Sequence, residues 1–147
     1  LDAFKVPAHR LEPVGTVRGV QFVNDSKATN VDAVMRALEC FSRPVVLIMG
    51  GRNKGYDFNA LDAHVRRYVR KLIVIGEAGQ EIISALGTLP DNGAEHASDL
   101  DQAVRKAFDN AQAGETVLLS PACASFDMFG SYAERGEKFR QLVGELS

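Results

Sequence analysis

The sequence is poor in residues that cross-link a chain or anchor it. It has only two cysteines, Cys40 and Cys123, which lie far apart and lack the spacing of metal ligands. A disulfide framework and a zinc site are therefore not expected. No apolar run approaches the roughly 20 residues that a membrane-spanning helix needs, and no signal-peptide pattern stands at the start. We expect a cytoplasmic protein that does not enter a membrane.

An excess of charge of one sign is absent too. The net charge is −2 at pH 7, and Lys and Arg are dispersed along the chain. The basic surface of a nucleic-acid-binding protein is therefore not expected. The three histidines, His9, His64 and His96, have no ligand spacing, and no metal site is predicted.

Two common nucleotide-binding motifs are missing. No G-x-G-x-x-G follows an expected strand, so the fingerprint of dinucleotide binding is lacking. No G-x-x-x-x-G-K-[ST] occurs either, because Gly-Gly-Arg-Asn-Lys-Gly at residues 50–55 has another order and spacing. This sequence therefore cannot supply a complete ATP-binding P-loop.

What is present suits one globular domain. The sequence has 147 residues, of which 46% are hydrophobic and 24% charged. A domain of this size buries about two-thirds of its unfolded surface. Residues 1–10, with Pro7, predict a linker or lead-in, and residues 11–147 predict the domain. The first residue, Leu1, fits a domain cut from a longer protein.

Strand and helix patterns alternate along the domain. Short extended stretches at 11–17 and 20–23, separated by Arg18-Gly19, predict a hairpin. Apolar runs predict buried strands, and spaced apolar residues predict helices between them. The runs lie at 45–49, 72–75 and 116–119, a short strand is expected near 95–97, and helices are expected at 30–41, after Asp57 or Asn59, near 82–86, after Ser98 and after Ser131. Capping boxes are predicted for Thr29 with Asp32, Ser98 with Asp101 and Ser131 with Glu134.

This alternation implies parallel strands joined by right-handed crossovers. The predicted fold is a three-layer, Rossmann-like α/β domain with a mostly parallel sheet and the first hairpin at its edge. Ligands of such sheets bind outside the carboxyl ends of the strands. Three polar loops follow strands there, at residues 24–30, 50–57 and 120–131.

These loops combine cations, hydroxyls and small residues. Lys27, Lys54, Thr29, Ser120 and Ser125 are predicted to surround one rim, which suits a small dianion. The first loop, residues 24–30, also begins a helix, where free N–H groups favour an anion. A purely structural interpretation stays open for it, because Thr29 with Asp32 would also cap that helix.

The three loops resemble, in order, those of the D-glutamate-adding Mur ligases. These are the UDP-N-acetylmuramoyl-L-alanine:D-glutamate ligases of peptidoglycan synthesis, and the likeness is to their C-terminal domain. Asp-Ser-Lys-Ala-Thr-Asn at 25–30 and Ser-Pro-Ala-Cys-Ala-Ser at 120–125 are the specific motifs. Residues 50–58 and the lead-in 9–12 are also similar, so the resemblance covers essentially the whole chain.

The resemblance implies a three-domain enzyme of cell-wall formation, on which cell shape and division depend. ATP, with Mg²⁺, phosphorylates the terminal carboxylate of the UDP-linked substrate. The amine of D-glutamate then attacks the acyl phosphate through a tetrahedral intermediate. The C-terminal domain supplies the D-glutamate site and closes over ATP that the central domain mainly holds. A monomer is expected.

The resemblance also assigns residues. The D-glutamate pocket would be lined by Thr29, Lys54, Ser125, Phe126 and Tyr132. Arg10, Asp25 and Lys27 would face the nucleotide, with Lys27 as the catalytic residue and no metal ligand in this chain. Phe126 stands where relatives carry Leu, and Tyr132 where they carry Phe. The UDP-binding domain, the P-loop and the Mg²⁺ ligands are absent, so this chain alone is expected to be inactive.

A second hypothesis is a stand-alone, flavodoxin- or receiver-like module that binds an anion. A receiver needs an acidic cluster with a phosphorylatable Asp, for which Asp25 and Asp57 are the candidates. Their neighbours Lys27 and Lys54, however, favour an anion over Mg²⁺.

Overall fold

The structure is a computed structural model that describes residues 9–53, 55–86, 93–125 and 128–146. Lys54, Phe126 and most of the expected lead-in lie outside these residues. The strands are β1 (Glu12–Val17), β2 (Val20–Asn24), β3 (Val45–Gly50), β4 (Val69–Ile75), β5 (Ala94–His96) and β6 (Thr116–Leu119). The helices are α1 (Val31–Leu38), the 3₁₀ turn η2 (Phe58–Leu61), α2 (Asp62–Tyr68), α3 (Gly79–Leu86), α4 (Leu100–Asn110) and α5 (Tyr132–Gly144).

The strands form one sheet in the order β1-β2-β6-β3-β4-β5. Only β1 is antiparallel to its neighbour, and the other pairs are parallel. Arg18 and Gly19 both have positive φ, at 51° and 79°, as a two-residue hairpin turn requires. The predicted mostly parallel sheet with a hairpin at its edge is confirmed.

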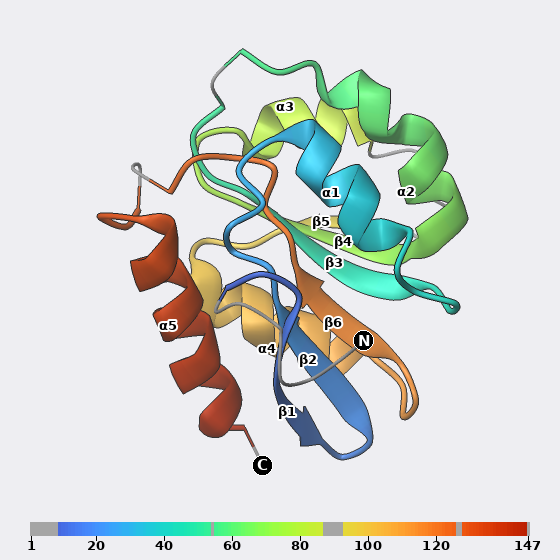
Figure 1. The fold of residues 1–147 in the computed structure, drawn as a ribbon, viewed down its shortest axis with the longest axis vertical. Coiled ribbons are helices and arrows are strands. Elements are labelled where there is room, and N and C mark those ends of the chain that lie inside the picture. Colours follow the sequence, from blue (N-terminus) through green and yellow to red (C-terminus); the bar gives the residue numbers. More distant parts are fainter. Residues whose placement is uncertain (1–8, 54, 87–92, 126–127, 147) are drawn as a thin grey trace.

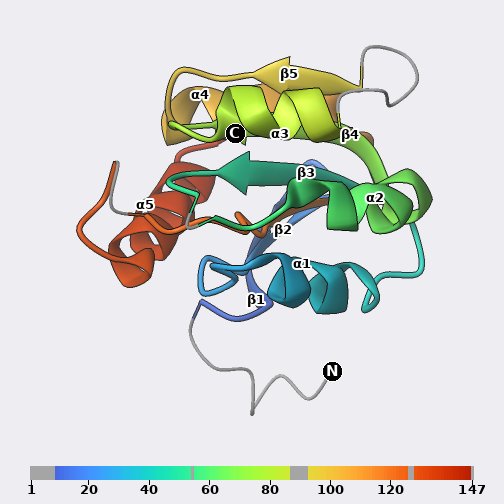
Figure 2. The same cartoon turned by 90° about the horizontal axis from the view of Figure 1, so that it is seen from above.

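Helices cover both faces of the sheet, with α1 and α4 on opposite sides (Figures 1 and 2). Side chains alternate along a strand, so each strand can serve two cores. Val45, Leu47 and Met49 of β3 pack with α1, η2, α2 and α3. Val46 and Ile48 of the same strand pack with α4 and α5. The apolar run of β3 is therefore uninterrupted because both of its faces are buried.

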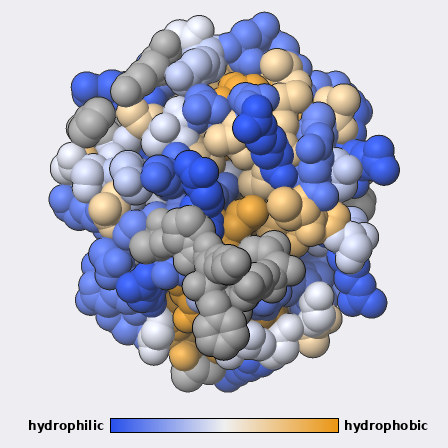
Figure 3. Space-filling model, in the orientation of Figure 1, coloured by the Kyte–Doolittle hydropathy of each residue, from blue (hydrophilic) through white to orange (hydrophobic). Residues whose placement is uncertain are grey.

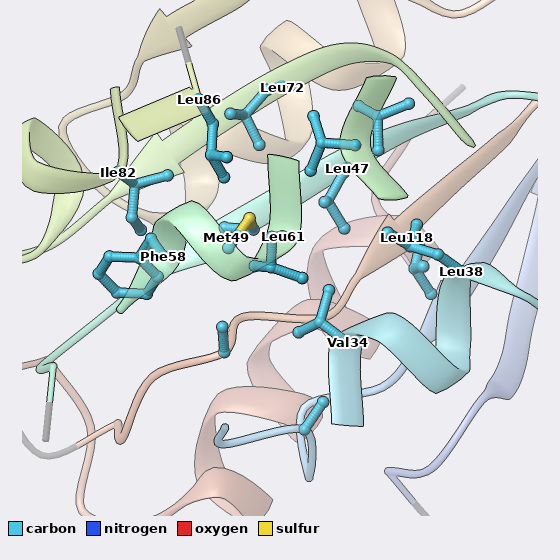
Figure 4. Packing of buried hydrophobic residues seen from close by; sticks show 14 of the residues in the cluster. Val34, Leu38, Leu47, Met49, Phe58, Leu61, Leu72, Ile82, Leu86 and Leu118 are labelled. Atoms are coloured by element: carbon cyan, nitrogen blue, oxygen red, sulfur yellow. The ribbon is translucent and has the colours of Figure 1, made fainter. Parts of the chain in front are cut away.

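The larger core is seen from close by in Figure 4. Its labelled side chains come from four sides: α1, the strands, η2 and α3. They are Val34, Leu38, Leu47, Met49, Phe58, Leu61, Leu72, Ile82, Leu86 and Leu118, all nearly inaccessible to solvent. The apolar positions that predicted α1 are thus the ones that pack against this core, with Met35 only half-buried.

Several predicted boundaries were wrong. Helix α1 ends at Leu38 instead of about residue 41, and β4 begins at Val69 instead of residue 72. The start of β4 contains Arg70 and Lys71, whose charges concealed it. Both are used in ion pairs, Arg70 with Glu115 at 2.7 Å and Lys71 with Glu95 at 3.2 Å.

Two of the three capping boxes were also wrong by one residue. Asn30, and not Thr29, caps α1 by accepting the Ala33 N–H at 2.8 Å. Asp99, and not Ser98, caps α4. The cap of α5 is confirmed, since the Ser131 hydroxyl accepts the Glu134 N–H at 3.1 Å.

Hydrophilic residues are spread over the face of the molecule shown in Figure 3, with hydrophobic residues gathered in patches between them. Within the described ranges, no helix combines the length and apolar character needed to cross a membrane.

Candidate functional site

The three polar loops meet at one edge of the sheet. They follow β2, β6 and β3, which are adjacent and parallel, so their carboxyl ends lie together. Main-chain hydrogen bonds then join loop to loop. The Ala122 N–H donates to the Ala28 carbonyl at 2.9 Å, which links residues 120–131 to residues 24–30. The three loops therefore meet at one edge of the sheet, as expected from the parallel strands.

The loop after β3 joins the same framework. The Gly50 N–H donates to the Pro121 carbonyl at 3.0 Å, and Arg52 exchanges two main-chain bonds with Ala124 at 2.9 and 3.0 Å. Gly50 and Gly51 have φ angles of 132° and 136°, which residues with a side chain rarely adopt. A Cβ on Gly51 would also collide with the Ala124 carbonyl. Glycine is needed here because two backbones approach closely.

Asp25 lies at the centre of the rim and is almost completely buried, with 4% exposed. Its Oδ2 accepts the Ser120 hydroxyl at 2.8 Å, and its Oδ1 accepts the Leu11 N–H at 3.1 Å. Burial raises the pKa of Asp25 to about 6, although these hydrogen bonds and the charge of Arg10 act in the opposite direction. The Ser120 hydroxyl was predicted to face an anion, which was wrong, because it is buried and donates to Asp25.

A cleft of about 320 Å³ opens beside Asp25. All three residues predicted to face the nucleotide line it, namely Arg10, Asp25 and Lys27. Helix α1 forms the opposite wall and contributes Arg36, which pairs with Asp32 at 3.0 Å. The cleft therefore combines cations with one buried carboxylate, which suits a ligand that carries both phosphate and hydroxyl groups.

Lys27 and Tyr132 connect this cleft to the start of α5. The Lys27 Nζ lies 5.8 Å from the centroid of the Tyr132 ring, within the range of a cation–π contact. The His9 ring also lies beside the Tyr132 ring, in an edge-on arrangement with 6.1 Å between the ring centroids. Tyr132 is 37% exposed. Tyr132, which the resemblance assigns to the D-glutamate pocket, thus lies beside Lys27, which it assigns to the nucleotide.

Of the other four residues that the resemblance assigns to D-glutamate, the structure describes Thr29 and Ser125. Thr29 is half-buried in the first loop, directly before the cap of α1. Ser125 is buried, with 3% exposed, and its carbonyl accepts the N–H groups of Met128 and Phe129. Lys54 and Phe126 lie outside the described residues. The structure thus brings their loops together without showing the whole pocket.

Arg135 holds the loops of the rim to α5, a role that was not predicted from the sequence. Its side chain is fully buried and donates to the Ser26 hydroxyl at 2.9 Å, the Ser26 carbonyl at 2.8 Å and the Cys123 carbonyl at 3.1 Å. Helix α5 is thereby fixed to both the first and the third loop. A signal existed, since Arg135 stands four residues before Phe139 on the apolar stripe of α5, where a charge needs partners.

A second network of hydrogen bonds, also not predicted from the sequence, holds residues 9–12 in place. Asn24 Nδ2 lies 2.9 Å from His9 Nδ1 and donates to Glu12 at 3.1 Å. Arg140 of α5 donates to both Glu12 oxygens at 2.7 Å. Gly136 leaves room for this packing, because a Cβ there would collide with the His9 ring. Residues 9–12 are therefore tied firmly to the rim.

Among the described residues, no three His, Cys, Asp or Glu side chains gather as a metal ion would require. The cations that line the cleft are Arg10, Lys27 and Arg36, residue types that suit an anionic ligand.

Known proteins are similar to this chain in sequence. Residues 9–123 match the family described as Mur ligase, glutamate ligase domain. The chain is 50% identical over 147 residues to the UDP-N-acetylmuramoylalanine–D-glutamate ligase of Salinibacter ruber, covering 99% of this chain and 32% of that protein. It is 46% identical to the enzyme of the same name from Cytophaga hutchinsonii, covering 100% of this chain and 32% of that protein. The chain thus spans about a third of the length of these relatives.

Solved structures agree on the fold. The chain superposes on a bifunctional folylpolyglutamate synthase/dihydrofolate synthase from Yersinia pestis with a TM-score of 0.65 at 18% identity, over 93% of this chain and 31% of the other. It also superposes on a murein peptide ligase from Psychrobacter arcticus with a TM-score of 0.65 at 15% identity, over 95% of this chain and 30% of the other. The family match decides against the receiver-like alternative. The chain belongs to the Mur ligase family and matches its glutamate ligase domain, and the relatives described above are named as ligases that add D-glutamate.

Proposed function

We propose that this chain binds D-glutamate and closes over ATP in a ligase that extends UDP-N-acetylmuramoyl-L-alanine. The observation that carries the proposal is the cleft lined by Arg10, Asp25 and Lys27, together with its contact to Tyr132. The names of the relatives support the choice of amino acid. The complete reaction belongs to a protein about three times as long, because the chain covers only 32% of those relatives.

On the nucleotide side, the residues fit complementary parts of the ligand. Arg10 and Lys27 are exposed cations on the cleft and suit phosphate oxygens, and Lys27 is the proposed catalytic cation. Asp25 suits a ribose hydroxyl. A carboxylate has about four acceptor positions, and the bonds from Ser120 and Leu11 occupy two of them, so capacity remains. Mg²⁺ would be held mainly by residues outside this chain.

On the amino-acid side, D-glutamate is a dicarboxylate that needs cations and hydroxyls. Lys54, Thr29 and Ser125 would provide these, while Phe126 and Tyr132 would form the apolar wall. In the proposed reaction ATP transfers its terminal phosphoryl group to the substrate carboxylate. The glutamate amine then attacks the acyl carbon, loses a proton, and phosphate leaves as the amide forms. This chain contributes binding and orientation to that step.

The test is the Lys54→Ala variant of the full-length protein. Loss of a charge-assisted contact is expected to lower kcat/KM for D-glutamate roughly 30- to 150-fold, with little change in the KM for ATP. Lys138→Ala is the matched control, since Lys138 is an exposed lysine on α5. Unchanged kinetics for D-glutamate in Lys54→Ala would refute the assignment.

The resemblance also supports a cytoplasmic monomer, which sedimentation of the full-length protein would check. By itself, this chain is expected to fold without turning over ATP.

A further inference from the structure

Helix α1 brings a third cation to the cleft beside Asp25. Arg10 and Lys27, the two cations predicted to face the nucleotide, come from residues 9–12 and from the first loop. Arg36 comes from the last turn of α1 and lines the same space of about 320 Å³. Our interpretation of the sequence assigned no role to Arg36. The cleft therefore has cations on two of its walls, and only those of one wall have been assigned to the nucleotide.

The wall that carries Arg36 leaves room for a ligand. Ala33 and Ala37, which lie three residues before Arg36 and one residue after it, also line the cleft. Their side chains are small and fill little of the space. The Arg36 side chain itself is 79% exposed, and exposed side chains change rotamer within nanoseconds. The Arg36 guanidinium can therefore turn towards a ligand in the cleft.

In the structure, Asp32 is the partner of Arg36. The Arg36 Nη2 lies 3.0 Å from the Asp32 Oδ2, four residues earlier on α1. Both side chains are well exposed, and an exposed ion pair of this kind contributes little to stability. A phosphate group carries more negative charge than a carboxylate, and it can accept two parallel hydrogen bonds from a guanidinium. A phosphate group in the cleft would therefore take Arg36 from Asp32.

We propose that Arg36 is a further nucleotide-binding residue, which leaves Asp32 and binds a phosphate group of ATP when the cleft is occupied. Asp32 is its partner in the empty cleft and, because Asp32 also lines the cleft, its carboxylate repels the incoming anion. The inference rests on the proposed function, in which this cleft receives the nucleotide. Arg36 and Asp32 are therefore expected to affect ATP binding in opposite directions.

The experiment uses the full-length protein, calorimetric titration with ATP and steady-state kinetics. Arg36→Ala is expected to raise the dissociation constant of ATP about threefold to tenfold, because a charge-assisted contact at a solvent-exposed site is lost. The KM for ATP should rise in parallel, whereas the KM for D-glutamate should not change. Arg36→Lys keeps the charge but not the planar fork of donors, so it should give a smaller increase.

Helix α2 offers a matched control. Arg66 pairs with Asp62 at 3.0 Å with the same spacing of four residues, and both side chains are about half exposed. None of the described residues that line the cleft belongs to α2. Arg36→Ala and Arg66→Ala should lower the melting temperature slightly and to a similar extent, but Arg66→Ala should leave ATP binding unchanged. If Arg36→Ala binds ATP as tightly as Arg66→Ala does, the proposal is overturned.

Asp32→Asn separates ligand binding from a structural role of the ion pair. If only the pair mattered, Asp32→Asn and Arg36→Ala would both weaken ATP binding, since each breaks it. Because Asp32 competes with the phosphate group, Asp32→Asn is instead expected to lower the dissociation constant of ATP about twofold to fivefold. Asp62→Asn is the control, since it also removes a carboxylate from the first turn of a helix. Weaker ATP binding by Asp32→Asn would show that the pair is structural.

Failure of the inference and failure of the proposed function give different results. If Lys27→Ala leaves ATP binding unchanged, the cleft does not receive the nucleotide and the proposed function fails. If Lys27→Ala weakens ATP binding and Arg36→Ala does not, only the role of Arg36 fails.

Discussion

Asp25 shows at the scale of one residue that burying a carboxylate opposes stability at neutral pH. A carboxylate that is 4% exposed has lost most of its hydration, and two hydrogen bonds replace only part of it. Its pKa is consequently raised from 3.8 to about 6. Between these values the folded state binds more protons than the unfolded state, so the contribution of Asp25 to stability falls as the pH rises.

We therefore predict that Asp25→Asn stabilises this chain at pH 7.5. One pKa unit corresponds to about 1.4 kcal/mol, which gives an upper limit of about 3 kcal/mol for removing the charge. Because Asn replaces one acceptor oxygen by a donor, we expect about 1–3 kcal/mol. The gain should grow between pH 4 and pH 6.5 in urea unfolding experiments.

The control for this prediction is Asp109→Asn, which changes an exposed carboxylate on α4. A stability difference for Asp25→Asn that does not vary with pH would contradict the burial argument. In the full-length protein, the same substitution is expected to weaken ATP binding, because Asp25 is proposed to accept from the ribose.

At the scale of an element, the start of α1 separates capping from binding. Asn30 has extended backbone angles of −146° and 165°, and its side chain accepts the Ala33 N–H. Thr29 has the spacing to Asp32 that a capping box requires, but it stands one residue too early. Thr29 is thus not the N-cap of α1, so its proposed contact with D-glutamate does not compete with capping.

Substitutions at these two neighbouring positions are therefore predicted to affect different properties, stability for Asn30 and substrate binding for Thr29. Asn30→Ala should lower the free energy of unfolding by about 1 kcal/mol, the usual value of a lost N-cap. Thr29→Ala should change stability by less than about 0.5 kcal/mol while raising the KM for D-glutamate in the full-length protein. Equal destabilisation by the two variants, measured by urea unfolding, would show that both residues cap the helix.

At the scale of the whole molecule, Arg135 joins helix α5 to two of the three loops at the rim. It projects from α5 and donates to carbonyls of the first and third loops, which follow different strands. The guanidinium of Arg135 is fully buried, and its hydrogen bonds compensate for the water that it has lost. Removing this side chain would leave its buried acceptors without a donor. The rim loops and α5 are therefore expected to behave as one unit.

We predict that Arg135→Ala destabilises the chain by about 3 kcal/mol or more, because acceptors on both loops lose a charged donor. Arg105→Ala is the control, since that exposed arginine pairs with Asp101 on the surface of α4, and its loss should cost less than about 0.5 kcal/mol. Urea unfolding of both variants is the measurement. If Arg135→Ala lowers the free energy of unfolding by less than about 1 kcal/mol, Arg135 does not hold the loops and α5 together as one unit.

The order of strands and helices could be predicted because each is encoded in neighbouring residues. The apolar run of β3, the stripe of α1 and the serine cap of α5 are local patterns, and all three exist in the structure. The position of the three loops followed from the parallel sheet. Errors arose where a charged strand start, such as Arg70 in β4, finds its partner far away.

The interior of the site was not predictable in this way. Ser120 and Asp25 are 95 residues apart, and Arg135 and Ser26 are 109 residues apart, yet each pair forms a buried hydrogen bond. Composition and spacing could mark the loops as candidates for binding, because their residue types indicate which ligands they would suit. Whether a given hydroxyl or carboxylate faces a ligand or another side chain depends on burial and on distant partners. Only the folded chain brings those partners together, so the roles of Ser120, Asp25 and Arg135 were decided by packing.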